Sequence, residues 1–229
     1  MESTLTARSD PSLLFTDKHG SYERFIRFVR YPQGIRDFFL QSPLLRSGLR
    51  VLDGGCGTGI VTLALRDALV RRRLTPGPLH AFDLTPAMLE RFRHTLLVLG
   101  IEGVETAQAN VLELDALPEA WVQYDLIVSA SMLEYLPRHR LADALRELRG
   151  RLRADGHFVL FITRRNRLTR PLIGRWWQAN LYSKEELQDA FSRAGFSRCA
   201  FRSFPPVARH LALWGYVIEA GTNRPTHSN

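Results

Sequence analysis

The segment VLDGGCGTGI, Val51 to Ile60, joins a short apolar run to a helix-like stretch through a turn of small residues. Asp53 begins this turn, and Gly55, Gly57 and Gly59 follow at every second position. Glycine has no Cβ, so its backbone N–H group can come close to a ligand. The pattern predicts a binding turn between a strand over residues 50–52 and a helix over residues 60–73.

Two phosphate-binding motifs do not fit this turn. The dinucleotide fingerprint G-x-G-x-x-G requires a glycine at position 60, where the chain has Ile60. A Walker loop requires a lysine after the glycines, and none follows. An anionic side chain would also repel pyrophosphate, so Asp53 favours a ligand with an ammonium group here. Alternatively, or in addition, its carboxylate supports the glycine turn through an Asx turn.

The rest of the chain alternates between strand-like and helix-like segments. Further strands are expected over residues 79–84, 103–109, 124–130, 157–163, 198–203 and 211–220. Further helices are expected over residues 86–100, 138–153 and 184–195. Thr85 and Pro86 suit a helix start, and Ser183 with Glu186 forms a capping box. This alternation predicts an α/β fold with a mostly parallel sheet, helices on both faces, and an antiparallel pairing of the last two strands.

Composition favours one domain in a reducing compartment. The 229 residues are 45% hydrophobic, which can supply a substantial core. Cys56 and Cys199 lie far apart, without metal-ligand spacing, so neither a metal site nor a disulfide is expected. No signal peptide and no apolar run of about 18 residues is seen, so we expect a cytoplasmic protein without a membrane span.

Arginine dominates the positive charge of the chain. The net charge is +8, with 29 arginines and 2 lysines. Arginine suits bidentate recognition of carboxylate or phosphate groups, and coding bias explains the excess equally well. A nucleic-acid partner therefore stays an alternative.

Four motifs together resemble one family. VLDGGCGTG resembles motif I of the class I S-adenosylmethionine-dependent methyltransferases. The similarity extends to the family's second motif, the strand-four motif and the segment that leads into strand five: AFDLTPAML (81–89), YDLIVSASMLEYL (124–136) and LRADGHFVLFI (152–162). The four occur in the expected order, and the resemblance covers about residues 22–196. It implies a Rossmann-like sheet of seven strands and S-adenosylmethionine as methyl donor, with S-adenosylhomocysteine as product.

The resemblance also implies the cofactor-binding residues: Asp53, Gly54, Gly55, Gly57, Gly59, Asp83, Leu84, Met88, Asn110, Val111, Ser129 and Tyr22. Asp83 follows Gly59 by 24 residues, close to the roughly 20 expected of an acid that binds a ribose. The alternative role for Asp83 is a helix cap or turn. Asn110 stands where the family usually has an aspartate that binds the adenine amino group. Its side-chain carbonyl retains an acceptor, and a turn-forming role is the alternative.

The implied reaction transfers an activated methyl group, which requires in-line geometry and exclusion of water. A base is needed only where the acceptor must lose a proton. Glu134 and Tyr135, just beyond the fourth strand, are the catalytic candidates. His139 is expected to be a solvated surface residue.

Two segments are expected to shape the acceptor pocket. Residues 19–39 form an amphipathic stretch that either folds over the cofactor, through Tyr22 and Phe25, or packs on the sheet. Residues 163–183 carry five arginines. An acidic acceptor would be held there by guanidinium groups and aromatic faces, from Arg164, Arg165, Trp176, Trp177 and Tyr182. The alternative is a solvated lid that its tryptophans anchor to the body.

We therefore expect a single domain over residues 1–229 that methylates an oxygen or nitrogen of a small-molecule acceptor. Its expected parts are a helical cap, a cofactor-binding half, an acceptor-side insertion, and a C-terminal helix with strands, over residues 19–45, 46–163, 164–183 and 184–220. An RNA methyltransferase and a non-catalytic cofactor-binding module are the alternative functions.

Overall fold

The computed structural model describes residues 28–175 and 178–222. It contains one seven-stranded sheet in the order β3-β2-β1-β4-β5-β7-β6. The strands are β1 (Val51–Gly54), β2 (Leu79–Asp83), β3 (Val104–Gln108), β4 (Tyr124–Ala130), β5 (Leu152–Thr163), β6 (Arg198–Arg202) and β7 (Gly215–Gly221). β7 runs antiparallel to both β5 and β6, and the other pairs are parallel. The predicted fold class is therefore confirmed.

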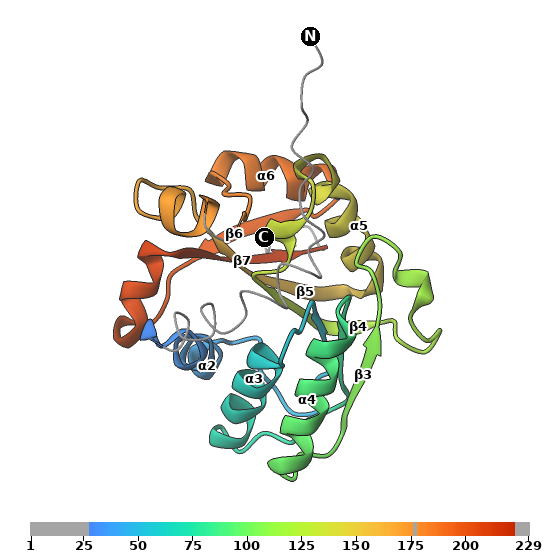
Figure 1. The fold of residues 1–229 in the computed structure, drawn as a ribbon. Helices are drawn as coiled ribbons and strands as arrows, with labels where there is room; N and C mark the ends of the chain where they lie inside the picture. Colours follow the sequence, from blue (N-terminus) through green and yellow to red (C-terminus); the bar gives the residue numbers. More distant parts are fainter. Residues whose placement is uncertain (1–27, 176–177, 223–229) are drawn as a thin grey trace, which may run out of the picture.

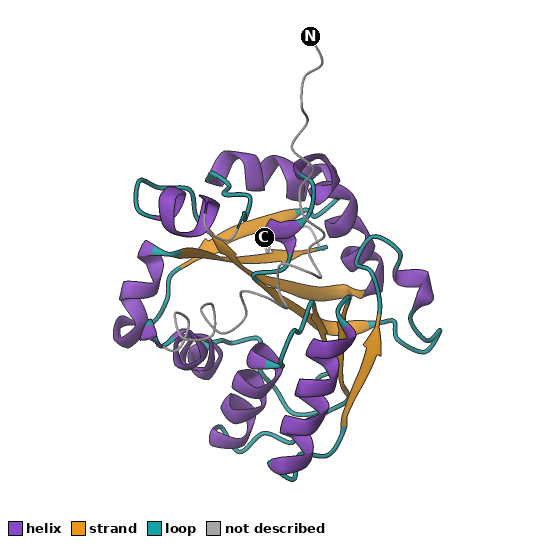
Figure 2. Cartoon of the chain, in the orientation of Figure 1, coloured by secondary structure: helices purple, strands orange, loops and turns teal. Residues whose placement is uncertain are grey.

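Helices cover both faces of the sheet (Figure 1; Figure 2). The α-helices are α2 (Tyr31–Gln41), α3 (Ile60–Arg71), α4 (Pro86–Val98), α5 (Leu141–Arg151) and α6 (Lys184–Arg193). Shorter helical segments are η1 (Leu114–Ala116), η2 (Leu133–Tyr135), η3 (Arg138–Arg140), η4 (Arg170–Arg175) and η5 (Pro206–Leu213). One apolar cluster joins the sheet to α5 and α6, and two others join it to α2, α3 and α4.

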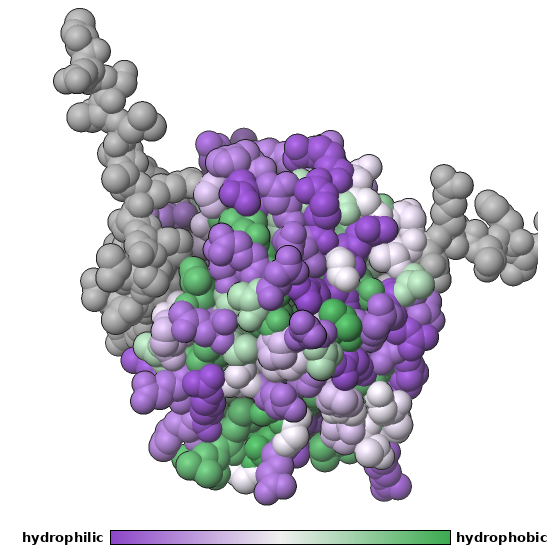
Figure 3. Space-filling model, turned by 90° about the vertical axis from the view of Figure 1, so that its right-hand side faces the viewer, coloured by the Kyte–Doolittle hydropathy of each residue, from purple (hydrophilic) through white to green (hydrophobic). Residues whose placement is uncertain are grey.

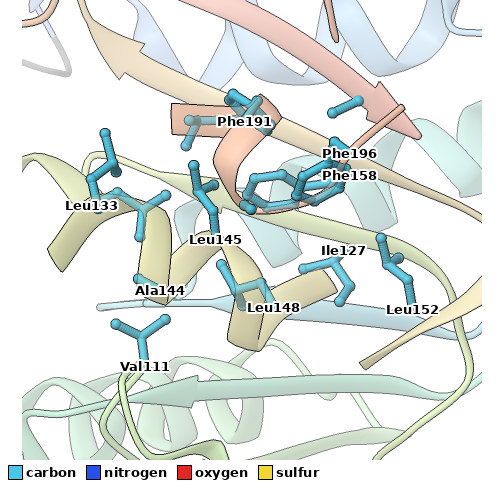
Figure 4. Close-up of a cluster of buried hydrophobic side chains, with 14 of the residues drawn as sticks. Val111, Ile127, Leu133, Ala144, Leu145, Leu148, Leu152, Phe158, Phe191 and Phe196 are labelled. Atoms are coloured by element: carbon cyan, nitrogen blue, oxygen red, sulfur yellow. The ribbon is translucent and has the colours of Figure 1, made fainter. Parts of the chain in front are cut away.

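The alternation of side chains in β5 shows how the sheet is buried on both faces. Phe158 and Leu160 pack in the cluster with α5 and α6, which Figure 4 shows in close-up. Val159 and Phe161 point the other way and pack with α2 and α3. Successive residues of a strand face opposite sides, so a strand covered on both sides must be almost continuously apolar. β4 has the same character and keeps its predicted bounds.

The N-terminal helix packs on the sheet. Ile35, Phe38 and Phe39 are buried on one side of α2, and both phenylalanines meet the ring of Phe161 edge-on at 5.5 and 5.9 Å. Of the two roles considered for this segment, packing is therefore the one seen for residues 31–41. Tyr22 and Phe25 lie outside the described residues.

Several predicted boundaries were wrong. The last strand begins at Gly215 rather than at 211, because the chain forms η5 first and buries Leu211 against Gly34 of α2. The helix expected over residues 138–153 divides into η3 and α5, and its last two residues already belong to β5. The strand expected over residues 157–163 already begins at Leu152, and its pairing with β4 shifts in register between Leu152 and His157.

The molecular surface includes small apolar areas. Figure 3 shows a largely hydrophilic side with an apolar area near its lower end. Leu97, Val98 and Leu99 are exposed where α4 ends. Among the described residues, no helix is long and apolar enough to cross a membrane.

The strand order identifies the place where a ligand would bind. β1 lies between β2 and β4, so the connection after β1 leads to one side of the sheet and the chain later returns on the other. In open α/β sheets this reversal opens a crevice at the carboxyl ends of the two strands. The residues after β1 and after β4 therefore line the expected site.

Candidate functional site

The glycine turn after β1 is shaped by close packing. A Cβ on Gly55 would lie 2.3 Å from Met132 Cγ, and one on Gly59 would lie 2.0 Å from the Phe92 ring. Both residues also have positive φ, of 74° and 85°. Gly57 differs, because a Cβ there would meet no atom within 4 Å. Its backbone consequently faces open space, where a ligand can approach.

Asp53 is a fully buried acid with two unequal oxygens. Oδ2 accepts hydrogen bonds from the backbone N–H of Thr62, at 3.0 Å, and from the Thr62 hydroxyl, at 2.6 Å. Oδ1 is buried without a hydrogen-bond partner. Burial raises the pKa of Asp53 to about 7, although the Thr62 hydrogen bonds lower it. One oxygen of Asp53 thus joins β1 to the first turn of α3, in place of the Asx turn that we considered, and the other oxygen is an unused acceptor.

Asp83 ends β2 and reaches the same turn. Its Oδ2 accepts from Gly57 N–H and its Oδ1 from Thr85 N–H, both at 2.8 Å. Burial raises its pKa, against the hydrogen bonds that it accepts. Thr85 is the N-cap residue of α4, but its side chain makes no capping hydrogen bond. Asp83 therefore has the turn role that we considered, with lone pairs left for further donors.

The two acids suit a positively charged ligand that also carries hydroxyl groups. Their negative charges act on each other, since the charge of Asp83 contributes to the raised pKa of Asp53. In the described part of the chain, the main influences that lower the pKa of either group are hydrogen bonds, not ion pairs. An unpartnered buried oxygen and a backbone cradle open at Gly57 match an amino-acid-bearing nucleoside with its ammonium near Asp53.

The remaining predicted cofactor residues differ in burial and in hydrogen bonding. Met88 and Val111 are buried, whereas Leu84 is largely exposed. Asn110 is half-buried, and its side-chain oxygen accepts from Leu112 N–H at 3.1 Å, as a turn-forming asparagine does. Ser129 is fully buried in β4, and its hydroxyl has no hydrogen-bond partner.

The segment after β4 carries a strained backbone residue and a buried acid. Ser131 has a positive φ of 53°, which is costly for a residue with a Cβ. Glu134 is buried, and its two carboxylate oxygens accept from Thr163 N–H at 2.8 Å and from the Thr163 hydroxyl at 2.9 Å. Burial raises the pKa of Glu134 to about 7, against these two hydrogen bonds. Glu134 thus joins the carboxyl ends of β4 and β5.

A small cavity of about 40 Å³ lies beside this acid. Its polar lining comes from Ser131, Glu134 and Thr163, and its aromatic lining comes from Tyr31, Phe161, Phe204, Trp214 and Tyr216. Complete small-molecule sites usually measure about 300–1,000 Å³. In this conformation the cavity is therefore much smaller than a complete small-molecule site.

The structure separates the other two candidates from this cavity. Tyr135 is half-buried and packs against Ile173, Ala179 and Leu181. His139 is exposed, as expected. Thr163 and Ser131 were not predicted, although Thr163 ends the strand beside β4. The rule that ligand-binding residues follow strand ends would have identified it.

The acceptor-side insertion is only partly as predicted. Arg164 donates from Nη1 to Ala212 O at 2.8 Å and lies over the Tyr216 ring, so it fastens β5 to the end of η5. Tyr182 is buried beneath the Arg138 guanidinium, 4.6 Å from its ring centroid. Arg165 is exposed and pairs with Glu186 at 3.2 Å. Trp176 and Trp177 lie outside the described residues.

Comparison with known proteins gives one matching family. A family model described as "Methyltransferase domain" matches residues 51–156. The 2-methyl-6-phytyl-1,4-hydroquinone methyltransferase 1 of Oryza sativa subsp. japonica is 27% identical over 86% of this chain and 58% of its own length. The malonyl-[acyl-carrier protein] O-methyltransferase of Halorhodospira halophila is 31% identical over 77% of this chain and 58% of its own. The chain thus spans less than two thirds of these relatives.

Solved structures share the fold. The magnesium protoporphyrin IX methyltransferase of Synechocystis PCC 6803 with bound S-adenosylmethionine has a TM-score of 0.63 at 14% identity. The superposition covers 95% of this chain and all of that one. The methyltransferase domain of the citrinin polyketide synthase has a TM-score of 0.62 at 18% identity, over 79% of this chain and 48% of that one.

Proposed function

We propose that the chain is a class I methyltransferase that uses S-adenosylmethionine to methylate a small-molecule acceptor, in keeping with the methyltransferase domain matched over residues 51–156. One observation carries the proposal. Asp53 and Asp83 stand at the carboxyl ends of neighbouring strands beside an open glycine turn, and in the described residues hydrogen bonds, not ion pairs, are the main influences that lower their pKa values. An ammonium group near Asp53 and ribose hydroxyls near Asp83 would supply the missing donors.

Each part of the cofactor has residues suited to hold it. The orphan Oδ1 of Asp53 would accept from the ammonium, and the backbone at Gly57 leaves space for the methionyl part. Asp83 would accept from the ribose hydroxyls. Leu84, Met88 and Val111 would supply apolar contact for the adenine, with Asn110 at its edge. Bound there, S-adenosylmethionine supplies a methyl group already activated by its sulfonium.

Glu134 would act on the acceptor. Its carboxylate lies at the small cavity, and Thr163 fixes its orientation through both oxygens. With a pKa of about 7, the group can accept a proton from a hydroxyl or amine at neutral pH. The aromatic lining of the cavity would exclude water and contact an apolar part of the acceptor.

The relatives support a small-molecule acceptor over RNA. Their names specify 2-methyl-6-phytyl-1,4-hydroquinone, malonyl-[acyl-carrier protein] and ubiquinone biosynthesis. We propose an acceptor of this size that carries a negative charge, because arginines dominate the segment after β5. The identity of the acceptor would determine whether an oxygen or a nitrogen receives the methyl group.

Calorimetry with S-adenosylhomocysteine tests the cofactor site. Asp83→Asn should weaken binding by about 10-fold or more, since hydrogen bonds to charged groups contribute about 1.5–3 kcal/mol. Asp189→Asn, on the exposed side of α6, is the matched control and should bind like the unmodified chain. No detectable binding by the unmodified chain at millimolar ligand would refute the proposal. Incubation of small-molecule extracts with isotopically labelled methyl donor then identifies the acceptor.

A further inference from the structure

A second, open pocket of about 570 Å³ lies between η3, the segment after β5 and the start of α6. Three arginines from separate elements line it: Arg138 of η3, Arg165 after β5, and Arg170 at the start of η4. Gly174, Ala179 and Leu181 add apolar surface. Its volume falls within the range of about 300–1,000 Å³ that small-molecule sites occupy.

Arg138 is held in place by its surroundings. Its Nη2 donates to the backbone oxygen of Leu181 at 2.7 Å, and its guanidinium lies over the buried ring of Tyr182. A guanidinium oriented in this way loses little conformational freedom when an anion binds. Tyr182, predicted to stack on the acceptor, therefore supports an arginine of the pocket instead.

The positive charge of the pocket is only partly offset. Glu186 Oε1 lies 3.2 Å from Arg165 Nη1 and 3.6 Å from Arg138 Nη1, so one carboxylate serves two arginines. The other oxygen of Glu186 accepts from Ser183 N–H at 2.6 Å and caps α6. Within the described part of the chain, no carboxylate forms an ion pair with Arg170. Among the described residues, Glu186 is thus the carboxylate that forms ion pairs with these arginines, and Glu185 is a further acid whose charge interacts with Arg165.

The pocket adjoins the segment that carries Glu134. Asn180 lines the pocket, and its backbone N–H donates to the backbone oxygen of Glu134 at 2.7 Å. Its side-chain amide donates to Leu136 O at 2.6 Å. An acceptor anchored in the pocket would therefore be held next to the loop that follows β4.

We propose that Arg138, Arg165 and Arg170 bind an oxyanion group, phosphate or carboxylate, of the methyl acceptor. The identity of that ligand as acceptor rests on the proposed function, whereas binding of an oxyanion does not. The sequence predicted that Arg164 and Arg165 bind the acceptor. In the proposed site Arg138 and Arg170 take the place of Arg164, because Arg164 fastens β5 to η5. Arg165 is common to both.

Binding of two probe anions tests the pocket. Inorganic pyrophosphate and tricarballylate are titrated into the full chain at low ionic strength, to represent a phosphate and a carboxylate ligand. Arg165→Gln and Arg170→Gln should each raise the dissociation constant of the preferred anion at least about threefold. Arg167→Gln removes the same charge from the same segment, from an exposed position outside the pocket, and should change it less than about twofold.

Glu186→Gln gives a change of opposite sign. Glutamine keeps an oxygen that can cap α6, but it removes the negative charge from the pocket. The dissociation constant should therefore fall at least about threefold, with the melting temperature preserved.

Two results would overturn the pocket: no binding of either anion by the unmodified chain at millimolar concentration, or equal effects of Arg165→Gln, Arg170→Gln and Arg167→Gln. Titration with S-adenosylhomocysteine separates this outcome from a failure of the proposed function. Anion binding without binding of S-adenosylhomocysteine would refute the methyltransferase proposal and leave the oxyanion site standing.

Discussion

The buried carboxyl group of Asp53 serves the fold with one oxygen and leaves the other free of hydrogen bonds. An acid in this position costs stability once it ionises, because burial has raised its pKa to about 7. A bound ammonium would favour the ionised form and lower that pKa. Binding of the cofactor and loss of the Asp53 proton are then coupled.

This coupling predicts proton release when the cofactor binds. Below pH 7 the free protein holds the Asp53 proton, so affinity for S-adenosylhomocysteine should rise with pH, by at most about tenfold per unit, and level off above 7. Calorimetry at pH 6.5 in buffers of different ionisation enthalpy counts the released protons. Asp53→Asn should reduce that number. An unchanged number would assign the coupling to another group, such as Asp83.

Glu134 predicts a second pH dependence, in the turnover rate. If the group acts as a base, kcat should rise as pH passes through about 7, where Glu134 ionises. Glu134→Gln should abolish this rise while leaving binding of S-adenosylhomocysteine intact. Retention of the same pH profile in the variant would exclude Glu134 as the base.

The same group should also affect stability. Its folded pKa of about 7 exceeds the ordinary value of 4.5, so its contribution is fully present below 4.5 and is lost as pH rises through 7. The loss is roughly 3 kcal/mol at full ionisation. Glu134→Gln should remove this loss, which urea unfolding at pH 5 and pH 8 measures. An equal loss in the variant would show that other groups cause it.

At the level of single residues, the sequence predicted the residues whose role depends on their immediate neighbours in the chain. Asp53 and Asp83 follow strands, beside glycines, and both lie at the turn. The partnership of Glu134 with Thr163 was not predictable, because it depends on how β4 and β5 are aligned. For the same reason the role of Arg164 was not predictable: nothing in the sequence indicates that Tyr216 and Ala212 hold Arg164 while Tyr182 supports Arg138.

At the scale of structural elements, two glycines of the turn after β1 have different roles: Gly59 is required for packing, and Gly57 leaves space for the ligand. Gly59→Ala places a methyl group against Phe92 and should cost about 1–3 kcal/mol through overpacking, beyond the backbone strain. Gly57→Ala meets no atom, so its cost should be limited to about 1–2 kcal/mol of strain at positive φ. That methyl group enters the space left for the cofactor, so affinity for S-adenosylhomocysteine should fall more than about tenfold.

Thermal unfolding and calorimetry on the same two variants provide the measurement. Stability should fall more in Gly59→Ala, while cofactor affinity should fall strongly in Gly57→Ala despite a folded protein. Equal affinity in Gly57→Ala and the unmodified chain would mean that the cofactor does not pass over this glycine.

The elements with local signals were predicted well. α6 has the capping box expected of Ser183 and Glu186, with both reciprocal hydrogen bonds present. α4 ends at Val98, and Gly100 just beyond it has a positive φ of 60°, as a glycine after a helix C-terminus should. The segment before β7 had no such signal. Leu211 and its neighbours are apolar in a strand as in a helix, and contact with α2 decides between them.

On the scale of the whole molecule, many of the arginines form ion pairs with acidic side chains. Arg71 pairs with Asp67, Arg146 with Asp143, and Arg202 with Glu219, as part of a wider set of ion pairs. Composition alone left nucleic acid as an alternative, because it cannot show which arginines already have partners. The folded arrangement therefore reduces the charge available to a long polyanion.

This distribution predicts weak, strongly salt-dependent binding of RNA and methylation confined to small molecules. Single-stranded RNA should bind through scattered arginines, and its affinity should fall steeply between about 50 and 200 mM salt. Binding of S-adenosylhomocysteine should change little over the same range, because its contacts are buried and short-ranged. The chain is incubated with labelled methyl donor, total RNA and a small-molecule extract, and the RNA is then separated from the small molecules by filtration. The label should appear only in the small-molecule filtrate. Label retained in RNA, with affinity that survives 200 mM salt, would instead establish the RNA methyltransferase.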